Sequence, residues 1–265
     1  MALALTAGAA AASAATAAAG FDRDQALAVS QAAIGRTLGD AVLIDRQGGT
    51  RRLSDYLGKP VVVSLIFTSC AHICPATTQQ LRRGVQVARQ VLGADSFQVL
   101  TIGFDTDRDT PAMMADYARR QGVQEPGWDF LAADAATIDR LAAELGFQFR
   151  STGGGFDHLI QSTIVDGNGT VYRQVYGIDF QIPHFVEPLK TLVFALEPDQ
   201  SLLAELTARI RLFCTVYDPA SDSYRFSYSI FVGLAVGTLM GALALYLLVG
   251  EWRRHHRLQR PAASA

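Results

Sequence analysis

The strongest constraint on the fold of this chain is the run Val61–Phe67, which is apolar at every position except Ser64. Most of its side chains are β-branched or aromatic, as is typical of β-strands. Because polar residues do not alternate with the apolar ones, the pattern indicates a strand buried on both faces. We therefore expect a sheet that is covered by other elements on both sides.

Strands and helices alternate after this run. A second apolar run, Phe97–Phe104, predicts another buried strand, and Pro111 opens a helix to about Gln121. This order predicts a three-layer α/β domain with a mixed sheet. The other expected elements are a helix at 22–34, short strands around a turn at 45–49, a helix from Pro75 to Gly93, a strand at 128–131, a helix at 135–145, a hairpin with strands 162–165 and 171–176, and a helix at 185–196.

A second kind of segment lies near the C-terminus. Ile230–Val249 contains no charged residue, and its length is close to the ~20 residues that cross the core of a bilayer. Tyr224 and Tyr228 precede it and Trp252 follows it, in the positions of the aromatic belts at membrane interfaces. We predict a single transmembrane helix at 226–250.

Charge predicts the orientation of this helix. Four arginines fall in the tail 251–265, and such basic residues stay on the cytoplasmic side. The linker 201–225 and the domain 21–200 are then outside the cytoplasm, which in a bacterium means the periplasmic side of the inner membrane. Residues 1–20 are rich in alanine and resemble the end of a secretory signal peptide, although no basic n-region precedes them. The competing interpretation, a second membrane helix, is disfavoured because alanine gains little on transfer to lipid.

Composition narrows the function classes. The 23 basic and 25 acidic side chains nearly cancel, so no general positive field argues for a nucleic acid as partner. The three cysteines, Cys70, Cys74 and Cys214, are too few for a disulfide-based scaffold. Each cysteine is therefore interpreted on its own.

Cys70 and Cys74 lie where the first buried strand gives way to a helix. Amide groups at a helix N-terminus stabilise anions, so we expect lowered pKa values and thiolates, which bind metals or attack disulfides. Dithiol oxidoreductases of the thioredoxin kind use C-x-x-C, whereas here one more residue intervenes. The wider loop suits a soft ion such as Cu(I). On the residues alone, metal binding and dithiol exchange both remain open.

His158 is the candidate for a third metal donor. It follows Gly153–Gly155, which we interpret as a flexible loop able to bring the imidazole over the cysteines, with Asp157 in position to support it. His72, between the cysteines, is interpreted as a solvent-facing neighbour or a weak auxiliary ligand, and His184 as structural.

Three aspartates, Asp105, Asp107 and Asp109, form a polar loop after the second buried strand. The Gly and the distal Glu of an EF-hand calcium loop are missing from the continuation. We interpret this loop as a turn that caps a helix and presents an acidic edge to a partner.

The segment Phe67–Pro75, with the sequence FTSCAHICP, resembles the copper motif of the Sco/SenC family of cytochrome c oxidase assembly proteins. Residues 104–110 are similar to that family's Asp-rich loop ending in Arg-Asp-Thr, and residues 156–158 fall where the family has an Asp-His pair ahead of a strand. The resemblance covers about residues 32–195. It implies a thioredoxin-like fold and three metal ligands: Cys70, Cys74 and His158.

The resemblance also implies a function and partners. It implies a membrane-anchored metallochaperone that holds Cu(I) or Cu(II) and passes it to the copper-bearing subunit of a cytochrome c oxidase, after loading by upstream periplasmic copper or thiol donors. The alternative is a thiol-disulfide oxidoreductase that reduces the cysteines of the oxidase copper site with the same pair. His158 discriminates, because dithiol exchange needs no third donor. A peroxiredoxin is excluded because Val63 and Phe67 occupy the positions of that family's Pro and Thr.

The segment 212–219, which contains Cys214 and a Tyr-Asp-Pro sequence, is similar to a bacterial branch of the family that also carries a C-terminal membrane helix. The common family pattern is an N-terminal anchor instead. For Cys214, a packing role beside the membrane and a redox or copper-relay role both remain open.

Overall fold

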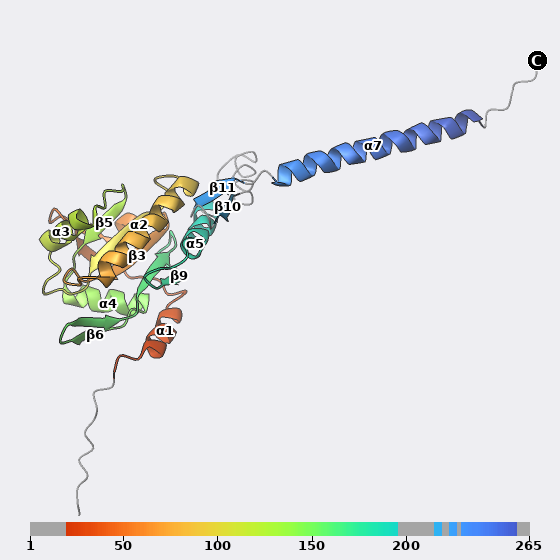
Figure 1. The fold of residues 1–265 in the computed structure, drawn as a ribbon. Coiled ribbons are helices and arrows are strands. Elements are labelled where there is room, and N and C mark those ends of the chain that lie inside the picture. The colour runs from red at the N-terminus through yellow and green to blue at the C-terminus, as the bar shows by residue number, and fades with distance from the viewer. Residues whose placement is uncertain (1–19, 196–214, 219–222, 227–228, 259–265) are drawn as a thin grey trace, which may run out of the picture.

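The computed structural model of the chain describes residues 20–195, 215–218, 223–226 and 229–258 (Figure 1). In chain order the elements are α1 (Arg23–Gln31), β1 (Val42–Ile44), β2 (Thr50–Arg52), the 3-10 helix η1 (Leu53–Tyr56), β3 (Val61–Ile66), α2 (Ile73–Leu92), β4 (Gln98–Gly103), α3 (Pro111–Gln121), β5 (Trp128–Leu131), α4 (Ala135–Leu145), β6 (Phe149–Thr152), β7 (Gly155–His158), β8 (Gln161–Val165), β9 (Val171–Tyr176), α5 (Ile182–Ala195), β10 (Thr215–Asp218), β11 (Ser223–Phe226) and α7 (Ser229–Leu258).

The central sheet has five strands in the order β5-β4-β3-β8-β9. Strand β3 pairs in parallel with β4 and antiparallel with β8, β5 joins parallel to β4, and β9 joins antiparallel to β8. All six residues of β3 are buried, because neighbouring strands flank it and helices cover both faces. The mixed sheet and the doubly buried central strand are as predicted.

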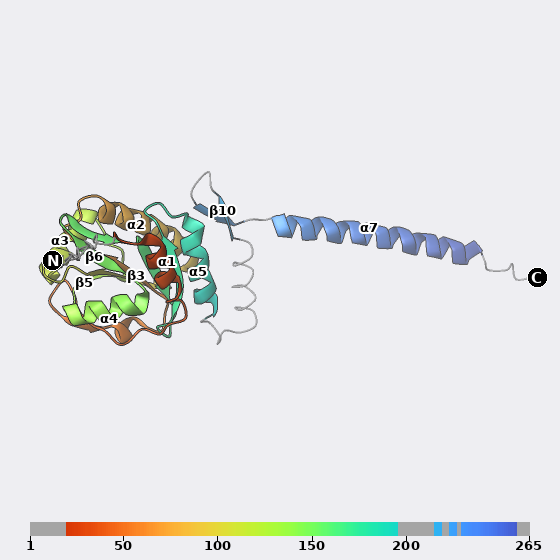
Figure 2. The ribbon, with the colours of Figure 1, turned by 90° about the horizontal axis from the view of Figure 1, so that it is seen from below.

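Helices form a layer on each face of the sheet (Figures 1 and 2). On one face α2 contacts both α3 and α5. On the other face α4 packs against α1, where a Cβ on Gly146, the residue that ends α4, would lie 2.7 Å from the carbonyl oxygen of Val29 in α1. These three layers confirm the predicted thioredoxin-like α/β fold.

Local sequence explains where the helices begin and end. The side chains of Asp22, Thr110 and Asp134 each accept a backbone N–H in the first turn of α1, α3 and α4, as N-caps do. Helices α3 and α4 end at Gly122 and Gly146, whose φ angles of 64° and 65° favour glycine. Two helices begin earlier than predicted: α2 begins at Ile73 and not at Pro75, and α5 begins at Ile182 and not at residue 185.

Two segments differ in kind from their prediction. The segment at Gly153–Gly155 is not a flexible loop, because β6 and β7 pair antiparallel on either side of it. The strands are short and largely exposed, so they lack the apolar alternation by which strands are recognised. Within the predicted linker 201–225, β10 and β11 also form a hairpin. Cys214 and residues 1–19 of the predicted leader lie outside the described residues.

Helix α7 contains the predicted membrane span. Its segment Val232–Trp252 has a mean hydropathy of 2.2 and is long enough to cross a membrane; no other helix among the described residues meets both conditions. The predicted span 226–250 overlaps this segment from Val232 to Gly250, and residues 227–228 of it lie outside the described part of the chain. Part of the basic tail continues the helix to Leu258, and residues 259–265 lie outside the described part.

The contact between α2 and α5 gives a test of the packing. A Cβ on Gly84 would lie 2.9 Å from Cδ1 of Phe185, and both residues are buried. Because a phenyl ring in a close-packed core has little freedom to retreat, Gly84→Ala is expected to destabilise the domain by about 1–3 kcal/mol. The measurement is urea unfolding of the full chain in detergent.

The matched control is Gly153→Ala, because an added Cβ there meets no atom within 4 Å. Its free energy of unfolding should equal that of the parent chain. Equal values for the parent and Gly84→Ala would contradict the packing described for α2 and α5.

Candidate metal centre

A tight turn connects β3 to α2 and carries the two cysteines. The Cys70 N–H donates to the Phe67 carbonyl oxygen at 3.1 Å, which closes the turn. His72 is the N-cap residue of α2, but its side chain makes no capping hydrogen bond. Instead, the Cys74 N–H donates to Sγ of Cys70 at 3.3 Å. The sulfur of Cys70 thus occupies the place of a capping oxygen, and the predicted order of strand, cysteine loop and helix is confirmed.

The two cysteines differ in exposure. Both are free thiols; Cys70 is partly exposed, while Cys74 is 3% exposed. Burial raises the pKa of the Cys74 thiol far above its usual value, and the Phe67 amide offsets this only in part. The expectation that the helix N-terminus lowers the thiol pKa values is therefore wrong for Cys74, where loss of hydration outweighs the helix dipole. Cys74 keeps its proton at neutral pH and loses it only when a metal ion binds or when the thiol is oxidised.

His158 ends β7 and lies among aromatic side chains. Its ring centroid is 5.3 Å from that of Phe147, 5.5 Å from Phe104 and 6.1 Å from Phe67. Its Nδ1 lies 3.0 Å from the carbonyl oxygen of Leu159. Because a carbonyl oxygen only accepts, Nδ1 carries the proton and Nε2 keeps its lone pair.

The aromatic surroundings also set the charge of this histidine. Burial lowers the pKa of His158, although the Leu159 carbonyl and the charge of Asp157 act in the opposite direction. The imidazole is consequently neutral at pH 7. A neutral imidazole with one nitrogen held by a hydrogen bond and the other free is the usual form of a metal-binding histidine.

The fold brings His158 and Cys74 to one place. Both line the same small cavity, together with Ile73, Thr77 and Ile160. Within residues 20–195 and the other described segments, however, no three His, Cys, Asp or Glu side chains are already close enough to hold a metal ion. Two sulfurs and one neutral imidazole are nevertheless the donor types that copper prefers. The three-ligand set therefore stays a prediction that the neighbourhood of these residues favours.

The remaining predicted residues have different surroundings. His72 is exposed at the N-terminus of α2, and His184 is exposed on α5, where it lines a separate cavity beside β9. Asp157 points to Arg150, with Oδ2 at 3.3 Å from Nη2, so the hydrogen bond that orients the His158 ring comes from Leu159. Asp157 therefore does not hydrogen-bond the His158 ring as expected, and acts on it only through its charge, which raises the pKa of the imidazole.

Sequence reasoning missed the special position of Asp109. Its side chain is 2% exposed, and Oδ1 accepts a hydrogen bond from the backbone of Thr68, two residues before Cys70. Asp107 in the same loop is exposed. The only sequence signal that separates the two is that Asp109 immediately precedes the N-cap Thr110 and Pro111.

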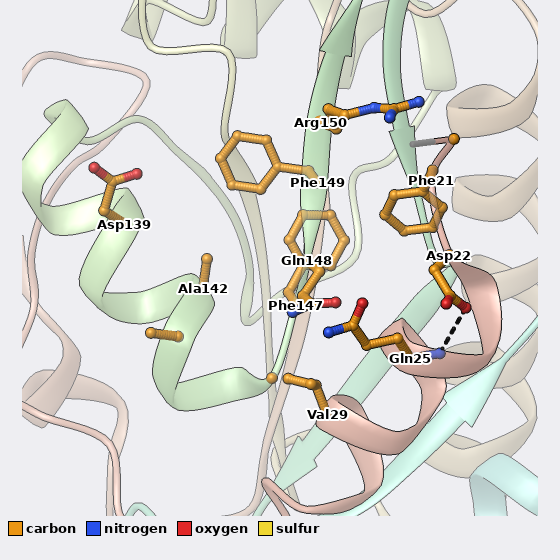
Figure 3. Close-up of a pocket in the computed structure, with 13 residues that line it drawn as sticks. Phe21, Asp22, Gln25, Val29, Asp139, Ala142, Phe147, Gln148, Phe149 and Arg150 are labelled. Atoms are coloured by element: carbon orange, nitrogen blue, oxygen red, sulfur yellow. Dashed lines mark hydrogen bonds between the residues drawn. The ribbon is translucent and has the colours of Figure 1, made fainter. Parts of the chain in front are cut away.

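A larger cavity of about 940 Å³ lies between α1, α4 and β6 (Figure 3). Phe147 and Phe149 line it with Phe21 and Val29, while the acidic Asp139 lies at the α4 side. None of the three predicted metal ligands lines this cavity. It borders the aromatic residues that surround His158 and is not the candidate metal centre.

Comparison with known proteins agrees with the fold and the motif. Protein SCO2 homolog, mitochondrial, of Bos taurus is 40% identical over 95 residues, which make up 35% of this chain and 34% of the relative. The match thus spans about a third of that relative's length. The crystal structure of a SCO1/SenC family lipoprotein from Bacillus anthracis str. Ames has a TM-score of 0.54 and 20% identity, and covers 60% of this chain and 95% of that one.

The structure of Bradyrhizobium japonicum ScoI with copper bound has a TM-score of 0.50 and 22% identity, and covers 60% of this chain and 99% of that one. At these identities, the two structural likenesses show the fold. A family model described as SCO1/SenC matches residues 31–193, which is more than half of the chain and includes both cysteines and the histidine. The chain therefore belongs to the SCO1/SenC family.

Proposed function

We propose that this chain is a membrane-anchored copper metallochaperone that binds one copper ion through Cys70, Cys74 and His158 and delivers it to the copper site of a cytochrome c oxidase during assembly. One observation carries the proposal: a neutral, partly buried histidine lines the same cavity as the buried cysteine. Family membership supports the general role, and the copper bound to ScoI of Bradyrhizobium japonicum supports the choice of metal.

The difference in exposure between the ligands suits transfer. Cys74 is 3% exposed, whereas Cys70 and His158 are both partly exposed. An incoming thiolate from the acceptor approaches the copper ion from the Cys70 side and displaces one donor at a time. The ion then passes between proteins without entering solution as a free ion.

Helix α7 supplies the proposed anchor. Val232–Trp252 has the length and hydropathy of a membrane span, and the basic residues that follow it favour a cytoplasmic C-terminus. The domain is then on the periplasmic side of the inner membrane. There it meets upstream copper or thiol donors and the copper-bearing subunit of the oxidase.

The cysteine pair also favours a second candidate function, reduction of the cysteines at the oxidase copper site. A partly exposed Cys70 next to a buried Cys74 matches an attacking and a resolving thiol. The Cys70 thiolate attacks a disulfide of the partner, forms a mixed disulfide and releases one partner thiolate. Cys74 loses its proton, attacks Sγ of Cys70 and releases the second partner thiolate, which leaves the Cys70–Cys74 pair oxidised. His158 has no part in these steps.

Copper binding by the reduced full chain in detergent tests the proposal. We expect one copper ion per parent chain. Removal of one donor by Cys70→Ser, Cys74→Ser or His158→Ala should weaken binding at least tenfold, because the ion loses one of three ligands. The control is His184→Ala, which removes an exposed histidine far from the cysteine cavity in the fold. The measurement is metal analysis together with competition against a chelator of known affinity.

An unchanged copper affinity in His158→Ala would show that His158 is not a ligand of the copper ion. A parent chain that binds no copper but reduces protein disulfides would replace the metallochaperone by the second candidate.

The pKa shifts predict how binding depends on pH. Cys74 is protonated at neutral pH because burial raises its pKa, so copper must displace this proton. The affinity should rise about tenfold per pH unit for each proton released, between about pH 6 and 8. His158 has a pKa below its ordinary 6.5, so the difference in affinity between the parent and His158→Ala should persist below that pH. Chelator competition at several pH values measures the copper affinity of the parent and of His158→Ala. A parental affinity that does not change with pH would contradict the expected release of a proton from Cys74.

The anchor is tested by cell fractionation. The full chain should stay in the membrane fraction after alkaline carbonate extraction, whereas a chain truncated after residue 228 should be released. With the outer membrane permeabilised, protease should digest the domain and spare an epitope tag at the C-terminus. Extraction of the full chain by carbonate, or digestion of the tag, would contradict the anchor or its orientation respectively.

A further inference from the structure

The buried carboxylate of Asp109 joins two loops at the candidate metal centre. Its Oδ1 accepts the backbone N–H of Thr68 at 2.8 Å and the Thr68 hydroxyl at 2.6 Å. Its Oδ2 accepts the backbone N–H of Asp105 at 2.9 Å. Both Thr68 and Asp109 are less than a tenth exposed. These three hydrogen bonds to one buried side chain link the β3–α2 turn to the β4–α3 loop.

The link acts directly on the cysteine turn. Thr68 is the residue after Phe67, whose carbonyl oxygen accepts the Cys70 N–H. Fixing both the amide and the hydroxyl of Thr68 therefore fixes one corner of the turn. Cys70 ends this turn and accepts the Cys74 N–H at its sulfur. The position of Sγ of Cys70 relative to Cys74 thus depends on the anchor at Asp109.

The surrounding backbone is built to accommodate this carboxylate. A Cβ on Gly103 would lie 2.4 Å from the Cβ of Asp109, so only glycine at the end of β4 leaves room for it. The Asp109 N–H also donates to the Asp105 carbonyl oxygen at 2.7 Å, which closes the loop. Asp107, two residues before Asp109, is exposed and accepts none of these bonds. Two aspartates of one loop therefore have different roles.

We infer that Asp109 is a positioning residue for the cysteine pair: through Thr68 it holds the turn in the arrangement in which both thiols are free to receive copper. This inference rests on the proposed function for its copper consequence. The redox consequence is independent of copper. The anchor holds the dithiol form, so its loss should favour the disulfide.

The test compares Asp109→Asn with Asp107→Asn in the full chain in detergent. An asparagine in place of Asp109 has only one acceptor oxygen, so its NH₂ group must face either Asp105 N–H or the two donors of Thr68. We expect a copper affinity at least tenfold weaker. We also expect the midpoint potential of the Cys70–Cys74 disulfide, measured without copper in glutathione buffers, to fall by ~30 mV, which is tenfold for a two-electron couple. Asp107→Asn should match the parent in both.

Three further variants separate positioning from loss of charge or of folding. Gly103→Ala keeps the carboxylate but displaces it, and should shift the potential in the same direction. Thr68→Val removes the hydroxyl donor and should give a smaller shift of the midpoint potential. Thr68→Ser keeps both donors, so its midpoint potential should equal that of the parent. Circular dichroism verifies that each variant is folded at the temperature of the measurement.

The outcomes distinguish this inference from the proposed function. If Asp109→Asn lowers only the unfolding temperature, and both potential and affinity equal those of the parent, the inference is wrong while copper binding by the parent still stands. If the parent binds no copper but Asp109→Asn shifts the potential as expected, the proposed function fails and the positioning role is supported.

Discussion

The turn between β3 and α2 is the constraint on which the rest of the site depends. Strand β3 is paired on both sides and covered on both faces, so its end has little freedom to move. The turn that follows is closed by the Cys70 N–H and continues into α2 through the hydrogen bond from the Cys74 N–H to Sγ of Cys70. The position of both sulfurs is thus set by the core of the domain together with the β4–α3 loop, which is hydrogen-bonded to the turn through Asp109.

Two elements from later in the sequence converge on this turn. The hairpin β6–β7 brings His158, held by aromatic rings and by the Leu159 carbonyl oxygen. The β4–α3 loop brings Asp109, which is bonded to Thr68. The neighbourhood is asymmetric: Cys74 is buried, whereas Cys70 and His158 are partly exposed. Burial keeps the imidazole neutral and the Cys74 thiol protonated. A metal ion therefore has to displace the Cys74 proton, while it gains a ready nitrogen donor from His158.

Much of this arrangement is readable from sequence, because its causes are local. Val61–Phe67 identified the buried strand, and Pro111 marked the start of a helix. The parts that were missed depend on tertiary contacts. Nothing local shows that Cys74 faces the core, where burial reverses the effect of the helix N-terminus on its pKa. The hairpin β6–β7 has short, exposed strands that resemble a glycine loop, and the inward turn of Asp109 beside an outward Asp107 follows from the vacant space over Gly103.

The central claim is that copper is held by two sulfurs and one imidazole nitrogen. X-ray absorption at the copper edge of the copper-loaded full chain measures these donors directly. We expect two sulfur neighbours and one imidazole nitrogen in the parent, and loss of the imidazole signal, with both sulfurs retained, in His158→Ala. A spectrum without an imidazole neighbour in the parent, or one left unchanged by His158→Ala, would contradict the account.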